Sequence, residues 1–277
     1  MSSGKKRRSG KGEARRRAAP GDAGQGGRPP GSVPRVAILA GVIVLLVGAA
    51  VWWRTVGPGS SRSASAAFEP VTPAEVQAQS ARQSTNEQAQ ALVRRGNELL
   101  RQGKADEAVR VYGDARQLAP EDEDVHYNLG IALARLGRDE EAAAAYRRAL
   151  ELFPAYAEAH NNLGNVLHRQ GKLEEAIEHF QAAIAATPDY ASAHNNLGNV
   201  FRQQGRLEDA MREFVAATRA DTNYWQAHFN LGNVHLAQDR VTEAVACYEA
   251  VLRLKPDFMP AREALERASR SLGPVRP

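Results

Sequence analysis

The chain has 277 residues, of which 43% are hydrophobic, so it is long enough to bury a sizeable core. Its net charge of +4 is segregated: residues 1–35 hold ten Lys and Arg against Glu13 and Asp22, a local +8 that leaves −4 on the remainder. This excludes a uniformly basic nucleic-acid-binding domain. The single cysteine, Cys247, excludes a disulfide framework and a paired-cysteine metal site.

Residues 1–35 form a basic tail rich in Gly and Pro, a composition that predicts disorder. Such a tail attracts anionic lipid headgroups or nucleic acid. Its place directly before an apolar segment favours a topology signal instead, and no nucleic-acid partner is expected.

The apolar segment is Val36–Trp53, which reads VAILAGVIVLLVGAAVWW without a charged residue. As a helix it spans roughly 27 Å, close to the ~30 Å hydrocarbon core of a bilayer, which predicts one transmembrane helix. Because the basic residues precede it, the positive-inside rule predicts a cytoplasmic N-terminus and an extracytoplasmic, periplasmic or lumenal, remainder. The alternative is a cleaved signal peptide with Ala-Ser-Ala at 64–66 as the cleavage site, which gives a secreted protein.

Residues 54–88 are predicted to be a linker. Its first part is rich in Gly, Ser and Pro and is typical of a flexible spacer. Thr72-Pro73-Ala74-Glu75 matches a capping box with Pro at the first helical position, which predicts a short helix to about Arg82. This helix can merge with the next one, which is expected to begin near Glu87.

A 34-residue period organises residues 89–258. The phrase AHNNLGNV occurs at 159–166 and 193–200, and AHFNLGNV follows at 227–234. Each copy predicts two helices; in the third they run over about 157–170 and 173–186 and end at Gly171 and Pro188. A lone hairpin of this size cannot bury its apolar face, but a stack can. Repeats 1 to 5 cover 89–122, 123–156, 157–190, 191–224 and 225–258.

Small and bulky residues recur in register. Glycine at the eighth position of each repeat is expected to meet alanine at the twentieth, where the two helices touch. An aromatic residue at the twenty-fourth position is expected to meet the next repeat. The glycines are Gly96, Gly130, Gly164, Gly198 and Gly232. The alanines are Ala108, Ala142, Ala176, Ala210 and Ala244. The aromatic residues are Tyr112, Tyr146, Phe180, Phe214 and Tyr248.

This pattern of Leu-Gly, Ala, an aromatic residue, Ala and Pro at fixed offsets resembles the tetratricopeptide repeat. The resemblance implies an all-α, right-handed superhelical solenoid whose first helices line a concave face. Two departures are Thr222 in place of Pro in repeat 4 and Arg95 in place of Leu in repeat 1. A third is histidine at the fourth position, where packing is favoured over metal binding. These histidines are His126, His160, His194 and His228.

Residues 259–273 are predicted to form a capping helix that begins at Pro260 and covers repeat 5 with an apolar stripe. The stripe consists of Ala261, Leu265, Ala268 and Leu272.

Asparagine recurs at the sixth and ninth positions of the first helices, three residues apart and therefore on one face. Stacked repeats would align these amides in a ladder, whose donors and acceptors match a peptide backbone. The feature resembles the repeat superhelix of O-linked N-acetylglucosamine transferase, where an asparagine ladder holds substrate peptide. The alternative is that duplication copied an asparagine without a role. With two fifth-position residues, the predicted peptide-binding residues are Asn97, Asn128, Asn162, Asn165, Asn196, Asn199, Asn230, Asn233, Asn161 and Asn195.

Other site types are not supported. The carboxylate clamp of related chaperone-binding repeats needs three cations, and Val93, Glu158 and Asn162 stand in their places, so the clamp is rejected. No catalytic motif stands out, and no metal site or cofactor is expected. The sequence predicts no enzyme but a membrane-anchored scaffold or adaptor that binds a protein or extended peptide during assembly of an envelope complex. The alternative function is an accessory substrate-recognition arm of a separately encoded enzyme such as a glycosyltransferase.

Overall fold

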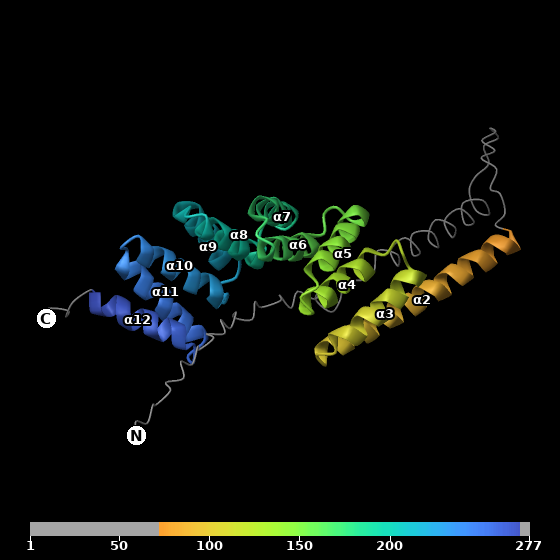
Figure 1. Cartoon of the computed structure of the whole chain (residues 1–277), viewed down its shortest axis with the longest axis horizontal. Coiled ribbons are helices and arrows are strands. Elements are labelled where there is room, and N and C mark those ends of the chain that lie inside the picture. The colour runs from red at the N-terminus through yellow and green to blue at the C-terminus, as the bar shows by residue number, and fades with distance from the viewer. Residues whose placement is uncertain (1–71, 272–277) are drawn as a thin grey trace, which may run out of the picture.

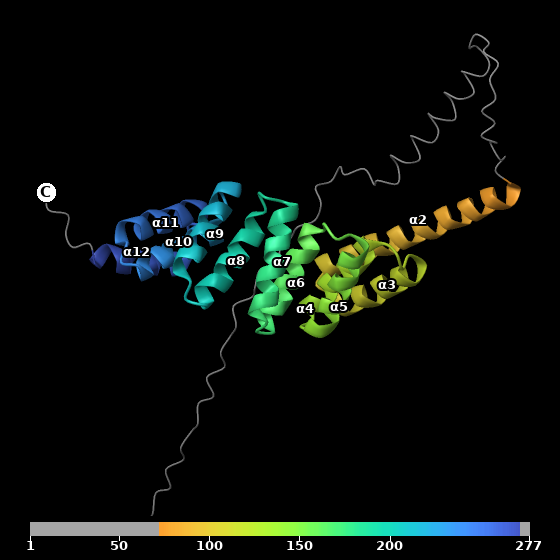
Figure 2. The same ribbon diagram turned by 90° about the horizontal axis from the view of Figure 1, so that it is seen from above.

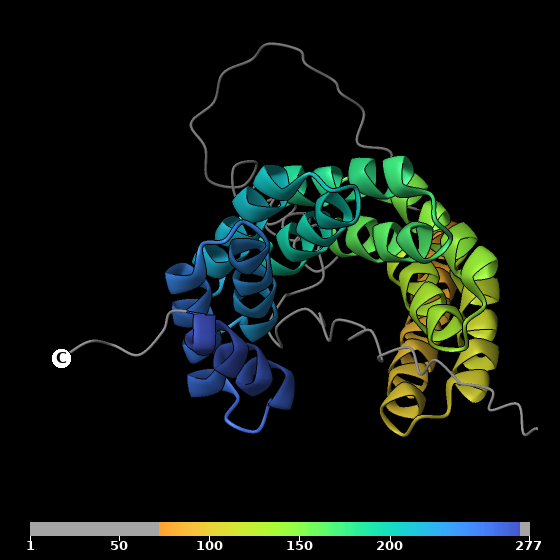
Figure 3. The ribbon, with the colours of Figure 1, turned by 60° about the vertical axis from the view of Figure 1, so that its left-hand side comes forward.

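The computed structural model describes residues 72–271, which form helices and no strand and stack into a continuous solenoid (Figure 1). Viewed from another side, the stack curves into an arch (Figure 3). The helices are α2 (Pro73–Arg101), α3 (Ala105–Leu118), α4 (Glu123–Arg135), α5 (Asp139–Leu152), α6 (Ala157–Arg169), α7 (Leu173–Ala186), α8 (Ala191–Gln203), α9 (Leu207–Ala220), α10 (Trp225–Ala237), α11 (Val241–Leu254) and α12 (Met259–Ser271). The all-α repeat fold is confirmed, with α6 and α7 within one residue of their predicted ends.

A residue with left-handed backbone joins the two helices of each repeat. Glycine has this role in repeats 1 to 4, with φ between 72° and 77° at Gly103, Gly137, Gly171 and Gly205. Glycine accepts this conformation because it lacks a Cβ atom. In repeat 5 the corresponding residue is Asp239, with φ of 57°.

The eighth-position glycine makes room for an aromatic ring of its own repeat. A Cβ atom added at Gly164 would lie 2.7 Å from Cε1 of Phe180, and one at Gly96 would lie 2.4 Å from Cε1 of Tyr112. These rings are fully buried. The atoms nearest to these glycines thus belong to the ring of the same repeat and not to the expected alanine, which corrects that expectation, while the expected contact of the ring with the next repeat stays a prediction. A planar ring reaches across the helix pair farther than the small alanine does.

The first helices of the repeats line the inner side of the arch. Successive first helices, such as α6 and α8, contact each other, whereas no comparable contact joins successive second helices within residues 72–271. In a curved stack, elements on the inner side lie closer together than those on the outer side. Side chains that bridge successive first helices therefore belong to the concave face.

Helix α2 is longer than a repeat helix because it includes the segment before repeat 1. Thr72 and Glu75 form the predicted capping box, and the helix continues unbroken to Arg101. Its first half is mainly exposed and reaches beyond α3, as Figures 1 and 2 show. The predicted merger with the first repeat helix is thus confirmed.

Helix α12 closes the other end of the solenoid. Ala261, Ala264 and Ala268 are buried, and the last two belong to one apolar cluster with Ala244 and Tyr248 of α11. This confirms the predicted cap and adds Ala264 to its buried stripe, while Leu272 lies outside the described residues.

The predicted membrane span, the basic tail and the Gly- and Ser-rich part of the linker lie outside residues 72–271. None of the helices within that range is both long and apolar enough to cross a bilayer. The transmembrane helix over Val36–Trp53 and its orientation stay predictions.

Candidate peptide-binding face

A ladder of side-chain hydrogen bonds joins successive first helices on the concave face. The Nδ2 group of Asn196 in α8 donates to Oδ1 of Asn161 in α6 over 2.9 Å, and Asn230 in α10 donates to Asn195 over the same distance. In repeat 3, Asn162 donates to the hydroxyl of Tyr127 over 3.2 Å. In repeats 3 to 5 the sixth-position amide thus contacts the fifth-position side chain of the preceding repeat. We call these three bonds the inter-repeat ladder.

The ladder ends where an acceptor is missing. Val93 has the fifth position of repeat 1, so the sixth-position Asn128 turns back and donates to the carbonyl oxygen of Asp124 over 2.7 Å. At the other end, the fifth position is Phe229, whose ring packs edge-on against Phe258 with centroids 5.2 Å apart. The ring of Phe258 also packs, tilted by 58°, against Trp225 with centroids 4.6 Å apart. The concave face therefore changes from amides in the centre to aromatic rings at its C-terminal end.

Burial separates the predicted amides into two groups. Asn161 and Asn195 are only 2% and 5% exposed, so they lie beneath the surface and position the sixth-position amides above them. The eight asparagines at the sixth and ninth positions are partly exposed. Peptide binding by all ten stays a prediction, but the partly exposed group has the access that direct contact requires.

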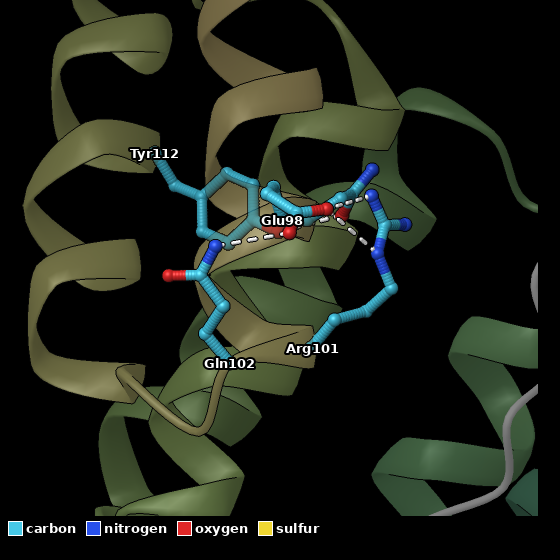
Figure 4. A network of polar contacts seen from close by, with 5 residues as sticks. Glu98, Arg101, Gln102 and Tyr112 are labelled. Atoms are coloured by element: carbon cyan, nitrogen blue, oxygen red, sulfur yellow. Dashed lines mark hydrogen bonds and ion pairs between the residues drawn. The ribbon is translucent and has the colours of Figure 1, made fainter.

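The ninth-position amides differ between the ends and the centre of the array. Asn97 accepts a hydrogen bond from the hydroxyl of Tyr112 over 2.6 Å, and Asn233 accepts one from Tyr248 over 2.9 Å. The same part of repeat 1 contains a polar network in which Arg101 and Gln102 both donate to Glu98 close to Tyr112 (Figure 4). By contrast, the side chains of Asn165 and Asn199 make no hydrogen bond within residues 72–271. The corresponding residue in repeat 2 is Ile131.

The fourth-position histidines tie each first helix to the turn before it. The Nε2 atom of His126 lies 2.8 Å from the carbonyl oxygen of Pro120, and His160 makes the same bond to Pro154 over 3.0 Å. His194 and His228 repeat it with Pro188 and Thr222. Thr222 can replace proline there because only its carbonyl is used. Leu92 is at the fourth position of repeat 1 and needs no such partner, because α2 continues from the preceding segment without a turn.

These contacts give all four histidines a structural role in joining a helix to a turn, and His126 is also buried. No group of three or more metal-ligating side chains occurs among the described residues. The carbonyl contacts themselves were not predicted, although a Pro six residues before three of the histidines was a usable signal. Arg262 in α12 donates to the carbonyl oxygen of Pro256 over 3.0 Å, so the cap helix is joined to the turn before it in the same way.

The Nδ1 atoms of two histidines face different partners in repeats 3 and 4. His160 Nδ1 lies 2.9 Å from His179 Nδ1, and burial together with the neighbouring imidazole lowers the pKa of His179 to about 4. Burial also lowers the pKa of His160. His194 Nδ1 instead lies 2.7 Å from Glu213, whose hydrogen bond raises the pKa of His194. The pKa values of the equivalent histidines His160 and His194 are therefore shifted in opposite directions.

Other polar side chains near the first-helix ends are used by the fold. Arg135 donates to the carbonyl oxygen of Leu100 over 2.9 Å, and Arg169 forms an ion pair with Asp139 of the preceding repeat. His168 contacts Gln203 over 2.6 Å. Arg202 is exposed and makes no ion pair among the described residues. Cys247 is half-buried, and burial raises the pKa of its thiol to about 11, so it is a poor nucleophile at neutral pH.

Comparison with known families agrees with this geometry. A family model described as TPR repeat matches residues 96–137, 132–171 and 164–201. A second, described as tetratricopeptide repeat, matches residues 195–258, so that the two cover more than half of the chain. The chain belongs to the tetratricopeptide repeat (TPR) family. No curated protein sequence matches it significantly.

Solved structures share the TPR solenoid. MamA 41-end from Desulfovibrio magneticus RS-1 is 26% identical, with a TM-score of 0.55 over 62% of this chain and 97% of that chain. A thermophilic TPR protein of Thermus thermophilus is 24% identical, with a TM-score of 0.54 over 66% and 99%. YrrB, described as a TPR protein with an unusual peptide-binding site, is 21% identical, with a TM-score of 0.53 over 68% and 97%. The last two likenesses are evidence of the fold alone.

Proposed function

We propose that this TPR protein is a scaffold that binds an extended polypeptide segment along the concave face, using amides of its first helices. The observation that carries the proposal is the row of partly exposed asparagines whose hydrogen-bonding capacity the fold only partly uses. An amide has two donor hydrogens and an acceptor oxygen. Asn196 and Asn230 each donate one hydrogen bond in the inter-repeat ladder, and the side chains of Asn165 and Asn199 donate none.

The chemistry of this face suits a polypeptide backbone. Neutral amides match N–H and C=O groups without selecting one charge, and asparagine is a poorer helix former than alanine by several tenths of a kcal/mol. Filling helix interiors with it therefore has a cost that binding would justify. The TPR fold of YrrB, whose description includes a peptide-binding site, is compatible with this role.

The proposed location is an extracytoplasmic membrane surface. It follows from the apolar span over Val36–Trp53 and the basic residues before it. A scaffold there would hold a partner during assembly of a membrane or envelope complex. The alternative, an arm of a separately encoded enzyme, predicts that one enzyme co-purifies in stoichiometric amount with the full-length chain in mild detergent.

A site-specific cross-linking experiment tests the binding face. A photoreactive amino acid replaces Gln203, which is exposed on α8 one turn after Asn199, in the full-length chain in its own cells. A matched control carries the same group at Glu178, which is exposed on the second helix α7. We expect a cross-link to an extended segment of one partner from Gln203 and none from Glu178. Cross-links from Glu178 alone would refute the concave face as the binding surface.

A further inference from the structure

At the twenty-fourth position, repeats 3 and 4 differ from repeats 1 and 5 by a single hydroxyl group. Tyr112 and Tyr248 place a hydroxyl on Oδ1 of the ninth-position asparagine in their own repeats. Repeats 3 and 4 carry Phe180 and Phe214 at this position, and both rings are fully buried over their glycines just as the tyrosines are. Without the hydroxyl, Asn165 and Asn199 keep their whole hydrogen-bonding capacity. The choice between tyrosine and phenylalanine thus decides which amides are available.

We infer that Phe180 and Phe214 determine where a bound polypeptide is held, at Asn165 and Asn199, and that its backbone there has the polyproline II conformation. This inference rests on the proposed function and deepens it. A free amide contacts both the N–H and the C=O group of one ligand residue. The tyrosine hydroxyl at the end repeats uses one of the two lone pairs of Oδ1 and fixes the orientation of the amide, which disfavours this paired contact.

The separation of the two helices that carry these amides favours one ligand conformation. Helices α6 and α8 are in contact, and packed helices have axes about 8–10 Å apart. A polyproline II helix repeats every three residues, which is about 9.3 Å at 3.1 Å per residue. A β-strand presents the same side every two residues, about 6.6–6.8 Å, which does not match. The matched ligand therefore offers a backbone N–H group at every third residue.

Aromatic surface continues this face toward the C-terminus. Trp225, Phe229 and Phe258 form a partly exposed cluster on α10 and the turn after α11. Proline-rich segments pack their rings on aromatic side chains of this kind. The ligand class is thus a proline-rich segment with a non-proline residue at every third position.

The probe is a fluorescent Ala-Pro-Pro repeat peptide of about twelve residues, and binding to the full-length chain in detergent is measured by fluorescence anisotropy. In the variant F180Y/F214Y, each new hydroxyl has an asparagine acceptor placed as in repeats 1 and 5, so the thermal melt should be unchanged. Binding should weaken about five- to 150-fold, the range for two lost hydrogen bonds. The matched control Y112F/Y248F changes the same atoms at the ends and should not weaken binding.

A second probe has N-methylalanine in place of alanine and lacks the N–H group. It should bind about five- to 150-fold more weakly than the first peptide. Equal affinity of F180Y/F214Y and the unchanged protein, with an intact melt, would overturn the assignment of Phe180 and Phe214. If the first peptide does not bind while Gln203 still cross-links to a partner, the polyproline II inference fails and the proposed function stands. If the peptide does not bind and Gln203 does not cross-link to a partner, both the polyproline II inference and the proposed function are refuted.

Discussion

Replacing a single eighth-position glycine by alanine tests how the repeats pack. Gly164 lies under Phe180, and a Cβ atom there would be 2.7, 2.9 and 3.0 Å from three ring atoms. Alanine improves the helix by about 0.5–1 kcal/mol, while overpacking a well-filled core costs typically about 1–3 kcal/mol. Because the ring is fully buried and cannot swing into solvent, the larger cost applies. The variant Gly164→Ala should therefore lose about 1 kcal/mol of unfolding free energy, within a range of about 0–2.5 kcal/mol.

Gly113 is the matched control. It lies inside α3, and an added Cβ atom there meets nothing within 4 Å. Gly113→Ala should stabilise the protein by about 0.5–1 kcal/mol, the opposite sign from Gly164→Ala. Both variants are measured by urea denaturation followed by circular dichroism, with hydrogen exchange to locate the effect. Because solenoid repeats contact only their neighbours, exchange should rise mainly in residues 157–190 of the Gly164 variant.

A double-mutant cycle with Phe180→Leu completes the test. In a protein with the smaller leucine, Gly164→Ala should cost less than it does beneath phenylalanine, since the two positions are coupled. If Gly164→Ala stabilises the protein as much as Gly113→Ala does, the reasoning about the ring and the glycine is refuted.

Four further predictions concern the last turn, the histidines, the cap and the topology. Asp239→Gly relieves a left-handed backbone at a non-glycine residue and should add about 0.5–1 kcal/mol of unfolding free energy by urea denaturation; a lower value contradicts the assigned strain. His160 and His179 have lowered pKa values, so the unfolded chain binds more protons, and their stabilisation should be lost as pH falls from about 7 toward 4. In the variant with His179 replaced by Gln, the unfolding free energy should depend less on pH. An unchanged dependence would count against the assignment to these histidines. Deleting 259–277 should speed hydrogen exchange in repeat 5 first, because α12 covers it; unchanged exchange would argue against a capping role. A reporter that works only in the cytoplasm should be silent when fused to the C-terminus, and an active reporter would reverse the predicted topology.

The fold could be predicted from the sequence because one pattern is repeated. The 34-residue period aligned the turn glycines, the phrase AHNNLGNV and the apolar stripes, so the helices of one repeat could be checked against those of the others. Helix ends in repeat 3 were accurate because Gly171 has the left-handed backbone its position required. The capping box at Thr72 was equally local, since its two partners are three residues apart. Helix ends and caps that depend on residues a few positions apart can therefore be predicted directly from the sequence.

The side-chain partners across repeats could not be read in this way. Asn196 bonds to Asn161, 35 residues earlier, so the contact joins the sixth position of one repeat to the fifth of another. The period places these residues in the same face but does not say in which direction each side chain turns. The same applies to the ring of Phe180, which covers its own glycine. Asn128 shows the limit best, because its direction depends on an acceptor missing from repeat 1.

The inter-repeat ladder also has a direction, because every donor belongs to the later repeat and every acceptor to the earlier one. Residues 157–190 carry both halves of the joint, the acceptor Asn161 and the donor Asn162. A tandem copy of this segment would meet the original through the same pair of amides that Asn196 and Asn161 form now. Duplication of this segment would therefore lengthen the array while every new contact between repeats keeps the same pair of hydrogen-bonding residues. Each inserted copy would add one more ninth-position amide without a hydrogen bond in the fold, so under the proposed function a longer array would bind a longer segment of its ligand.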